Sequence, residues 1–270
     1  MTYGYGLRDK RGTNMQTLAL DSKNIFGSDG SGNQIKSWIN SRFLIKVNSK
    51  YREASKEVDA YKLGTALGLD CAKYEQINVM FRGEKRVACI TESFLLPDEI
   101  ELTVAEILDT MQISIPMNMS AKSFIDITVK AINTVTSISV ESVYTWVYNM
   151  LVFDYIICND DRHLTNFELL FNPNTNTYRF APYYDHGESF LRTDSYLSLE
   201  NYTKLLRKFK AKPFSTNPDR NIGDYNRARQ SFETLIGNIG GAQNINNIGI
   251  SSGHLAIVKR RIERLKKMLY

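Results

Sequence analysis

One stretch of the chain limits its fold more than any other. Residues 141–157, ESVYTWVYNMLVFDYII, have helical periodicity and almost no charge between Glu141 and Asp154. A helix that is apolar on nearly every side must be covered by other elements, so it predicts a substantial helical core. The polar segment CNDDRHLTNF follows directly, at residues 158–167. Its acidic, amide and imidazole groups are therefore expected in a loop at the end of a buried helix.

Further helices are predicted after Pro97. Helical periodicity covers residues 101–111 and 120–135, and residues 255–270 place apolar side chains on one face and basic side chains on the other. A short hairpin is expected from FELLF to TYRFAPYYD, around a turn at residues 172–175. These elements predict a mainly helical C-terminal lobe.

The residues before Pro97 have a different character. Residues 17–20, 34–47 and 73–96 are expected to form strands, because β-branched and aromatic side chains alternate there between turn residues. Residues 51–69 lie between two of these hairpins and have the pattern of one amphipathic helix, which is expected to stop at Gly68.

We therefore predict an α+β, bilobal fold. Residues 1–97 would form a small antiparallel-sheet lobe and residues 98–270 a larger helical lobe. The apolar connection at residues 92–97 would be the hinge. Ligands commonly bind between two such lobes, so the functional groups are expected there.

Composition excludes several classes of protein. The net charge of +5 is spread evenly except in the basic C-terminal segment, which gives only a weak case for nucleic-acid binding. No apolar run approaches the length that spans a bilayer, and no signal sequence opens the chain, so we expect a cytoplasmic protein. Cys71, Cys89 and Cys158 lie far apart in apolar contexts, which predicts buried reduced thiols rather than disulfides or a zinc site.

Three residues have the spacing that phosphoryl transfer requires. This reaction needs a lysine on the phosphates, a partner for that lysine, metal ligands and a carboxylate that accepts the hydroxyl proton. Asp161 and Asn166 supply a carboxylate and an amide oxygen within one loop, and Asp185 closes the following hairpin in APYYDHG. Alone, Asn166 would be a turn residue and Asp185 a hairpin-end carboxylate; their joint spacing with Asp161 favours metal ligation.

These residues resemble the catalytic segment of HipA-like serine/threonine protein kinases, whose pattern is close to N-x-D-x-H-x-x-N-F followed by P-x-Y-D. The matching positions are Asn159, Asp161, His163, Asn166, Phe167, Pro182, Tyr184 and Asp185. The resemblance implies a protein-kinase-like fold, with Asp161 as the catalytic base and Asn166 and Asp185 as Mg²⁺ ligands. Asn159 and His163 are expected to hold the loop in shape.

The resemblance extends upstream and implies the nucleotide-binding groups. Residues 31–36, SGNQIK, resemble the family's loop over the phosphates, although a Gly/Ser run alone is equally well a flexible loop. The loop residues assigned to ATP are Gly30, Ser31 and Gly32. Lys46 matches the strand lysine that binds phosphates, and Glu57 matches the helix glutamate that pairs with it. Glu92 and Phe94 would offer a backbone carbonyl and N–H to adenine.

The function that the resemblance implies is ATP- and Mg²⁺-dependent phosphorylation of a serine or threonine in a protein substrate. Autophosphorylation is expected at Ser28 or Ser31, where about −2 charge would repel the nucleotide phosphates and switch the enzyme off. Two alternatives stay open. The D-R-H-x-x-N element also resembles the catalytic loop of phosphatidylinositol kinases, which act on lipids, and the chain could instead be a nucleotide-binding pseudokinase or regulatory module.

The chain also departs from the family pattern. Toxin-type members carry an N-terminal subdomain before the glycine loop that the short arm here cannot supply, so a minimal form is expected. The family resemblance suggests an antitoxin-like regulator, but docking on that subdomain is not expected. Asp160 is expected to cap the following turn and His186 to be incidental. The basic C-terminal helix fits a membrane or nucleic-acid surface, but a docked helix with a solvated face is commoner.

Overall fold

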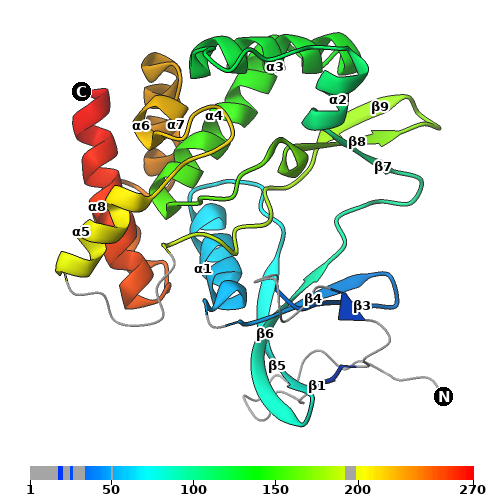
Figure 1. The fold of residues 1–270 in the computed structure, drawn as a ribbon, viewed down its shortest axis with the longest axis vertical. Coiled ribbons are helices and arrows are strands. Elements are labelled where there is room, and N and C mark those ends of the chain that lie inside the picture. The colour runs from blue at the N-terminus through cyan, green and yellow to red at the C-terminus, as the bar shows by residue number, and fades with distance from the viewer. Residues whose placement is uncertain (1–17, 21–24, 27–33, 50, 192–198) are drawn as a thin grey trace.

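The two predicted lobes are present in the computed structural model (Figure 1). The structure describes residues 18–20, 25–26, 34–49, 51–191 and 199–270. The α+β class is confirmed: a sheet and one helix form the first lobe, and helices with a small second sheet form the other. The boundary at Pro97 stays a prediction.

The sheet of the N-terminal lobe has, among the described residues, the strand order β1-β5-β6-β4-β3-β2. Its strands are β1 (Leu18–Ala19), β2 (Ile25–Phe26), β3 (Lys36–Ile39), β4 (Phe43–Val47), β5 (Tyr74–Phe81) and β6 (Glu84–Glu92). Neighbours are antiparallel except β1 and β5. The predicted hairpins are confirmed. Asn40 and Ser41, with φ of 52° and 53°, form the β3–β4 turn.

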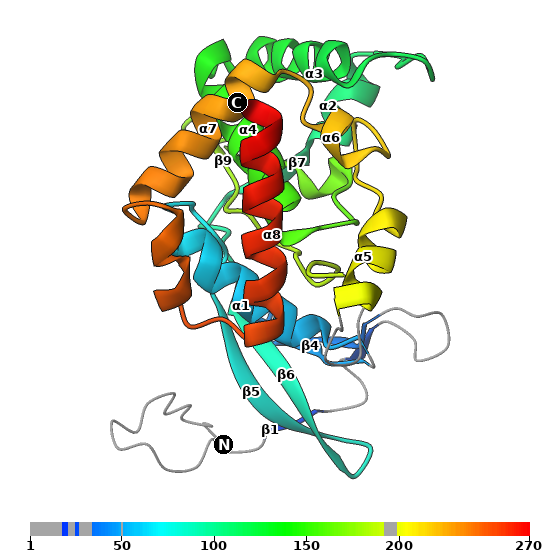
Figure 2. The same cartoon turned by 90° about the vertical axis from the view of Figure 1, so that its left-hand side faces the viewer.

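Helix α1 (Glu53–Ala66) packs against strands β4, β5 and β6. It ends where the sequence predicts, because Gly68 takes a φ of +81° that a side chain would strain. Several hydrogen bonds attach α1 to the other lobe. Asp59 Oδ2 lies 2.7 Å from His254 Nδ1, and Asn238 Nδ2 donates to the Leu67 carbonyl at 2.8 Å. In Figure 2, α8 runs beside α1.

The C-terminal lobe is built from helices around α4. Its helices are α2 (Val104–Thr110), α3 (Ala121–Thr136), α4 (Val140–Ile157), α5 (Leu199–Lys208), α6 (Pro218–Asn221), α7 (Tyr225–Asn238) and α8 (Ser252–Leu269), with 3₁₀ turns η2 (Leu164–Asn166) and η3 (Ala242–Asn247). Helix α4 contacts α3, α7 and α8, as its apolar sequence predicts. Its cap is Ser139, whose Oγ accepts from the Ser142 N–H, and it ends at Cys158, with φ of 53°.

One predicted helix is partly wrong. The periodicity of residues 101–111 predicted a helix throughout, but Ile100–Thr103 forms strand β7, and α2 begins only at Val104. Thr103 stops the helix there because its hydroxyl accepts from the Glu106 N–H while the Glu106 carboxylate accepts from the Thr103 N–H. Strand β7 pairs with β8 (Glu168–Asn172), and β8 pairs with β9 (Thr177–Phe180), in the hairpin that the sequence predicts.

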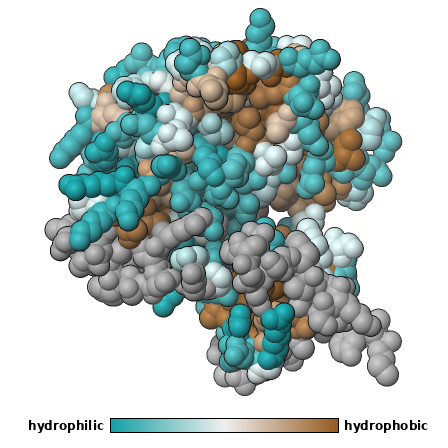
Figure 3. Space-filling model, viewed as in Figure 1, coloured by the Kyte–Doolittle hydropathy of each residue, from teal (hydrophilic) through white to brown (hydrophobic). Residues whose placement is uncertain are grey.

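The surface agrees with the ordinary interpretation of the basic C-terminal helix. Helix α8 buries Val258, Ile262 and Leu265 against the lobe and exposes Lys259 and Arg260. Figure 3 shows a largely hydrophilic face on the side of α5 and α8. No helix in the described part of the chain combines the length and apolarity that crossing a membrane requires.

The cysteine prediction holds for two residues of three. Cys89 and Cys158 are buried free thiols, while Cys71 is free but partly exposed.

Candidate active site

A buried arginine holds the loop that follows α4. Arg162 is fully buried, and its Nε and Nη2 donate to Asp154 Oδ2 (2.8 Å) and Oδ1 (3.1 Å). Its Nη1 donates to the Tyr184 carbonyl at 3.0 Å. Asn159 Nδ2 also donates to Asp154 Oδ1 at 2.9 Å, and Asn159 Oδ1 accepts from the Asp161 N–H at 3.2 Å. The carboxylate on α4 thus organises the loop and, through Arg162, the hairpin end.

Asp161 projects from this loop to a partly exposed position. Its Oδ1 lies 2.8 Å from His163 Nε2 and 2.9 Å from Lys212 Nζ, while Lys212 Nζ lies 3.1 Å from His163 Nε2. The three side chains are 41%, 50% and 39% exposed, respectively. This cluster is therefore open to a large molecule that approaches from solvent.

Asp185 lies where the two lobes meet. Lys46 Nζ, from β4, is 2.7 Å from Asp185 Oδ1 and 2.5 Å from Glu57 Oε1 on α1. The Lys46 and Glu57 side chains are 3% and 0% exposed. Glu57 Oε2 also accepts from the His186 N–H at 2.8 Å. The sequence-predicted lysine, glutamate and metal aspartate are thus in direct contact, across strand, helix and loop.

The lysine at this contact is held charged by two carboxylates, while burial and the nearby Asp185 raise the pKa of Glu57 despite the opposing effect of Lys46. Burial alone would lower the pKa of Lys46, but Asp185 and Glu57 outweigh it and raise that pKa well above its ordinary value. In turn, Lys46 holds the pKa of Asp185 far below its usual range, and Lys36 adds to the effect. Lys46 and Asp185 are therefore an ion pair throughout the physiological pH range.

Lys36, the last residue of the stretch expected to cover the phosphates, begins strand β3. It lies directly opposite Lys46 in the antiparallel β3–β4 pair. Residues directly opposite on neighbouring strands point to the same face of a sheet, so both ammonium groups face the Asp185 side. This pairing adds a second positive charge beside the proposed phosphate site. The alternation of side chains along one strand does not predict the pairing of Lys36 with Lys46, because this pairing depends on the register between β3 and β4.

Asn166 approaches Asp185 from the loop that follows α4. Asn166 Nδ2 donates to Asp185 Oδ2 at 3.3 Å, so the two side chains converge. Mg²⁺ in nucleotide sites takes one or two protein oxygens together with phosphate and water oxygens. The described residues contain no group of three or more His, Cys, Asp or Glu side chains that could hold a metal. The side-chain oxygens of Asn166 and Asp185 could supply the one or two protein ligands that a nucleotide-bound Mg²⁺ takes.

The expected hinge residues lie at the end of β6. Glu92 pairs through its side chain with Arg42, at the exposed surface. The Phe94 carbonyl accepts from Arg179 Nη2 at 2.8 Å, and the Phe94 ring lies 5.4 Å from the ring of Tyr184. The hinge segment is thereby held next to the residue that precedes Asp185.

Four assigned residues lie outside the described part of the chain. They are Ser28, Gly30, Ser31 and Gly32.

The expectation that His186 is incidental to the chemistry stays a prediction, although its ring has a packing role. Its ring is buried and packs edge-on against Phe153, with ring centroids 5.3 Å apart. Burial, with the positive charge of Arg162, lowers the pKa of His186 well below its ordinary value, so the ring is neutral. Its backbone N–H orients Glu57.

The importance of Arg162 had a partial signal in the sequence. Asp154 is a charged residue in an apolar helix, and a buried carboxylate requires a partner. The sequence carried no such signal for Lys212, because it lies 51 residues after its partner Asp161.

Comparisons with known proteins place this geometry in a family. Residues 6–242 match the model of the HipA-like C-terminal domain. No curated protein sequence matches the chain. The Helicobacter pylori proinflammatory kinase CtkA has a similar structure, with a TM-score of 0.62, 16% identity, and coverage of 87% of this chain and 90% of CtkA.

Two further structures show weaker likeness. HipA of the Shewanella oneidensis toxin–antitoxin system, solved with HipB and operator DNA, has a TM-score of 0.48 and 11% identity over 91% of this chain and 64% of HipA. WaaP, in complex with acyl carrier protein, has a TM-score of 0.39 and 11% identity over 93% of this chain and 89% of WaaP. The family match covers most of the sequence, and the CtkA likeness shows the fold. The chain therefore belongs to the HipA-like C-terminal domain family and has a kinase-like, two-lobed fold.

Proposed function

We propose that the protein is an ATP- and Mg²⁺-dependent kinase that transfers the γ-phosphoryl group to a serine or threonine hydroxyl of a protein. The observation that carries this proposal is the direct contact of Lys46 with both Glu57 and Asp185, beside Asn166. An ion pair that only stabilised the fold would need neither an amide side chain beside it nor a second lysine opposite it. Phosphoryl transfer needs a lysine on the phosphates, a partner that holds this lysine, and metal ligands.

Each residue then has a distinct task. Lys46 binds the nucleotide phosphates, and Glu57 keeps its ammonium in place. The oxygens of Asn166 and Asp185 hold Mg²⁺, which neutralises charge on the phosphates when it is bound. Asp161 orients the acceptor hydroxyl and takes its proton. Most of the rate enhancement comes from positioning and charge neutralisation, because phosphoryl transfer passes through a loose transition state.

The nucleotide base would bind at the hinge. The Glu92 carbonyl and the Phe94 N–H are backbone groups, so the adenine contact requires no particular side chain there. The glycine-loop residues Gly30, Ser31 and Gly32 would cover the phosphates.

A protein acceptor suits the exposed side of the site. The Asp161 side chain is 41% exposed, whereas the Lys46 side chain is 3% exposed. A segment of a protein substrate can therefore reach Asp161 without entering the nucleotide pocket. Autophosphorylation at Ser28 or Ser31 remains part of the proposal. Added phosphate there would repel the phosphates of ATP. An antitoxin-like regulator stays a prediction from the family resemblance.

The test is phosphate transfer by the purified protein. Incubation with γ-labelled ATP and Mg²⁺ should label the protein or an added protein acceptor, and EDTA should abolish the label. Acid hydrolysis should release phosphoserine or phosphothreonine, and intact-mass analysis should count the added phosphates. Label in phosphatidylinositol vesicles instead would indicate a lipid kinase. ATP binding without hydrolysis or transfer would indicate a pseudokinase and overturn the proposal.

A further inference from the structure

Lys212 reaches Asp161 from a distant part of the sequence. It belongs to residues 209–217, here called the Lys212 loop, which connects α5 to α6. Its Nζ lies 2.9 Å from Asp161 Oδ1 and 3.1 Å from His163 Nε2. We propose that Lys212 is a catalytic residue whose ammonium stabilises the charge of the phosphoryl group during transfer. This inference rests on the proposed kinase function.

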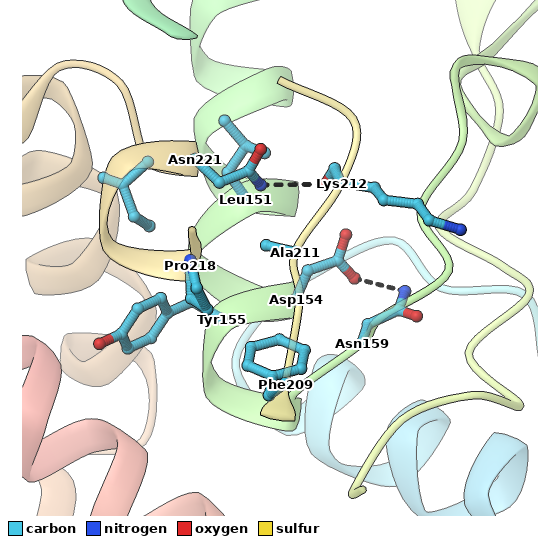
Figure 4. A pocket seen from close by; sticks show the side chains of 10 residues that line it. Leu151, Asp154, Tyr155, Asn159, Phe209, Ala211, Lys212, Pro218 and Asn221 are labelled. Atoms are coloured by element: carbon cyan, nitrogen blue, oxygen red, sulfur yellow. Dashed lines mark hydrogen bonds between the residues drawn. The ribbon is translucent and has the colours of Figure 1, made fainter. Parts of the chain in front are cut away.

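The Lys212 loop is held in place by one buried side chain. Asn221 is 5% exposed, and its Nδ2 donates to the Lys212 carbonyl at 2.9 Å. Its Oδ1 accepts from the Phe214 N–H (2.9 Å) and the Ser215 N–H (2.8 Å). Figure 4 shows Asn221 beside Lys212, across a small pocket from Asp154 and Asn159. The backbone that carries the Lys212 side chain is thus fixed relative to the catalytic loop.

The same loop is anchored to the core behind the site. The Phe214 ring packs edge-on against Phe124 and Phe167, at centroid distances of 4.9 and 5.9 Å. Phe167 directly follows η2, which contains Asn166. The Lys212 loop and the catalytic loop therefore share one packed support.

Stability does not explain this arrangement. The Lys212 and Asp161 side chains are 39% and 41% exposed, and an exposed ion pair is worth only about 0–1 kcal/mol. Lys210, in the same loop, points to solvent. A fixed backbone and a buried asparagine are thus used to aim one exposed ammonium at a carboxylate, which indicates a function for that ammonium.

The contacts of Asp161 show where the acceptor would bind. Within the described residues, the hydrogen bonds of this carboxylate, to His163 and Lys212, both use Oδ1. Oδ2 is therefore the atom that takes the hydroxyl proton. A hydroxyl oxygen about 3 Å from Oδ2 binds the same carboxylate that Lys212 Nζ contacts through Oδ1 at 2.9 Å, so the hydroxyl and the ammonium are neighbours. A flexible lysine with three donors spans the remaining gap to a phosphoryl oxygen.

The proposed transfer forms one bond to phosphorus and breaks another. The acceptor oxygen forms a bond to the γ-phosphorus while the bond from that phosphorus to the bridging oxygen breaks. The electron pair of the broken bond stays on ADP, and the hydroxyl proton passes to Asp161 Oδ2. Lys212 donates hydrogen bonds to an oxygen of the transferred group, remains charged throughout, and transfers no proton.

The experiment compares Lys212→Met, Lys212→Arg and the matched control Lys210→Met in the full chain. Turnover of γ-labelled ATP with Mg²⁺ is measured as kcat and KM, the Kd for ATP by titration, and Tm by thermal unfolding. We expect Lys212→Met to lower kcat about 100-fold, since loss of one donor to transition-state charge has about this effect. KM and Kd for ATP should change less than about twofold and Tm less than about 2 °C, because the exposed pair adds little stability. Lys212→Arg should recover most of kcat.

Other results would overturn either the kinase proposal or the inference about Lys212. If the wild-type protein turns over no ATP, the kinase proposal fails and this inference with it. If wild type is active and Lys212→Met matches Lys210→Met, only the inference about Lys212 is overturned. It is also overturned if Lys212→Met loses activity together with a fall in Tm of more than about 5 °C that Lys212→Arg does not restore, because that pattern is structural.

Discussion

The two sides of the site differ in their access to water. Lys46 and Glu57, on the proposed nucleotide side, are almost completely buried, whereas Asp161, His163 and Lys212, on the acceptor side, are partly exposed. Breaking a buried ion pair leaves an uncompensated charge, which costs about 3–5 kcal/mol, whereas an exposed pair contributes about 0–1 kcal/mol. Activity and stability should therefore be linked on the first side and separable on the second.

This difference suits a kinase. The nucleotide is the same in every turnover, so a closed and preorganised set of charges can serve it. A protein acceptor has to enter and leave, so the base that meets it must stay accessible. The contrast yields predictions for each side, and their failure would show that the two sides are not separate in function.

The largest effect is expected for Asp185→Asn. This change removes a carboxylate that contacts Lys46 and lies beside Asn166, so kcat should fall about 10³-fold or more, since metal and phosphate positioning both depend on it. Tm should also fall, because Lys46 loses one of its two carboxylate partners. Single-turnover transfer from labelled ATP and thermal unfolding measure the two effects. Unchanged transfer would remove Asp185 from the mechanism.

Asp161→Asn tests the exposed side. The variant should lose about 10²- to 10³-fold in kcat, the usual contribution of a general base, while Tm stays within about 2 °C of wild type. Its loss should not exceed that of Asp185→Asn, because proton transfer contributes less than charge neutralisation. Asp160→Asn is the control from the same loop and should retain activity. Full radiolabel transfer by Asp161→Asn would contradict the mechanism.

Glu57→Gln returns to the buried side, where stability and activity should fall together. The amide keeps an acceptor for the His186 N–H but removes the charge that faces Lys46. Lys46 retains Asp185, so the free energy of unfolding should fall by about 3 kcal/mol, the low end for a broken buried pair. Activity should fall about tenfold through misplacement of Lys46.

Urea unfolding measures the Glu57→Gln effect, and Glu84→Gln is its matched control. Glu84 forms an exposed pair with Arg86, and its loss should cost less than about 1 kcal/mol. Equal losses in the two variants would abolish the contrast between buried and exposed charge.

Local sequence carries much of this arrangement. Helix α4, the two N-terminal hairpins and the β8–β9 hairpin follow from periodicity and turn residues, because each is decided within a short segment. The same holds for the candidate residues Asp161, Asn166 and Asp185, which lie in one stretch of chain with a recognisable spacing.

Features that depend on distant contacts did not follow from the sequence. Ile100–Thr103 has a helical pattern but pairs with β8, so a tertiary contact overrides its local preference. Arg162 and Lys212 act through partners that only the folded chain brings near, and the Lys36–Lys46 pairing depends on strand register. Apart from the charged Asp154 in an apolar helix, which signals a need for a partner, these contacts have no signature in a single sequence.

The smallest expected effect concerns Glu168, a half-buried carboxyl at the start of β8 that lies between the two extremes. Burial raises the pKa of Glu168 to about 7, with Glu101 and Glu106 adding to it. A carboxyl whose pKa is raised in the folded state contributes most to the stability of the fold below its unfolded pKa of about 4.3. This contribution is lost as pH rises through the folded pKa of about 7. Glu168→Gln removes the ionisation. Its Tm relative to wild type should therefore increase by about 2 °C between pH 5 and pH 8.

The exposed Glu263→Gln is the control for Glu168→Gln and should follow wild type across this pH range. A parallel pH profile for Glu168→Gln and wild type would show that this carboxyl ionises as freely as an exposed one, and that partial burial at the border of the site has no electrostatic consequence.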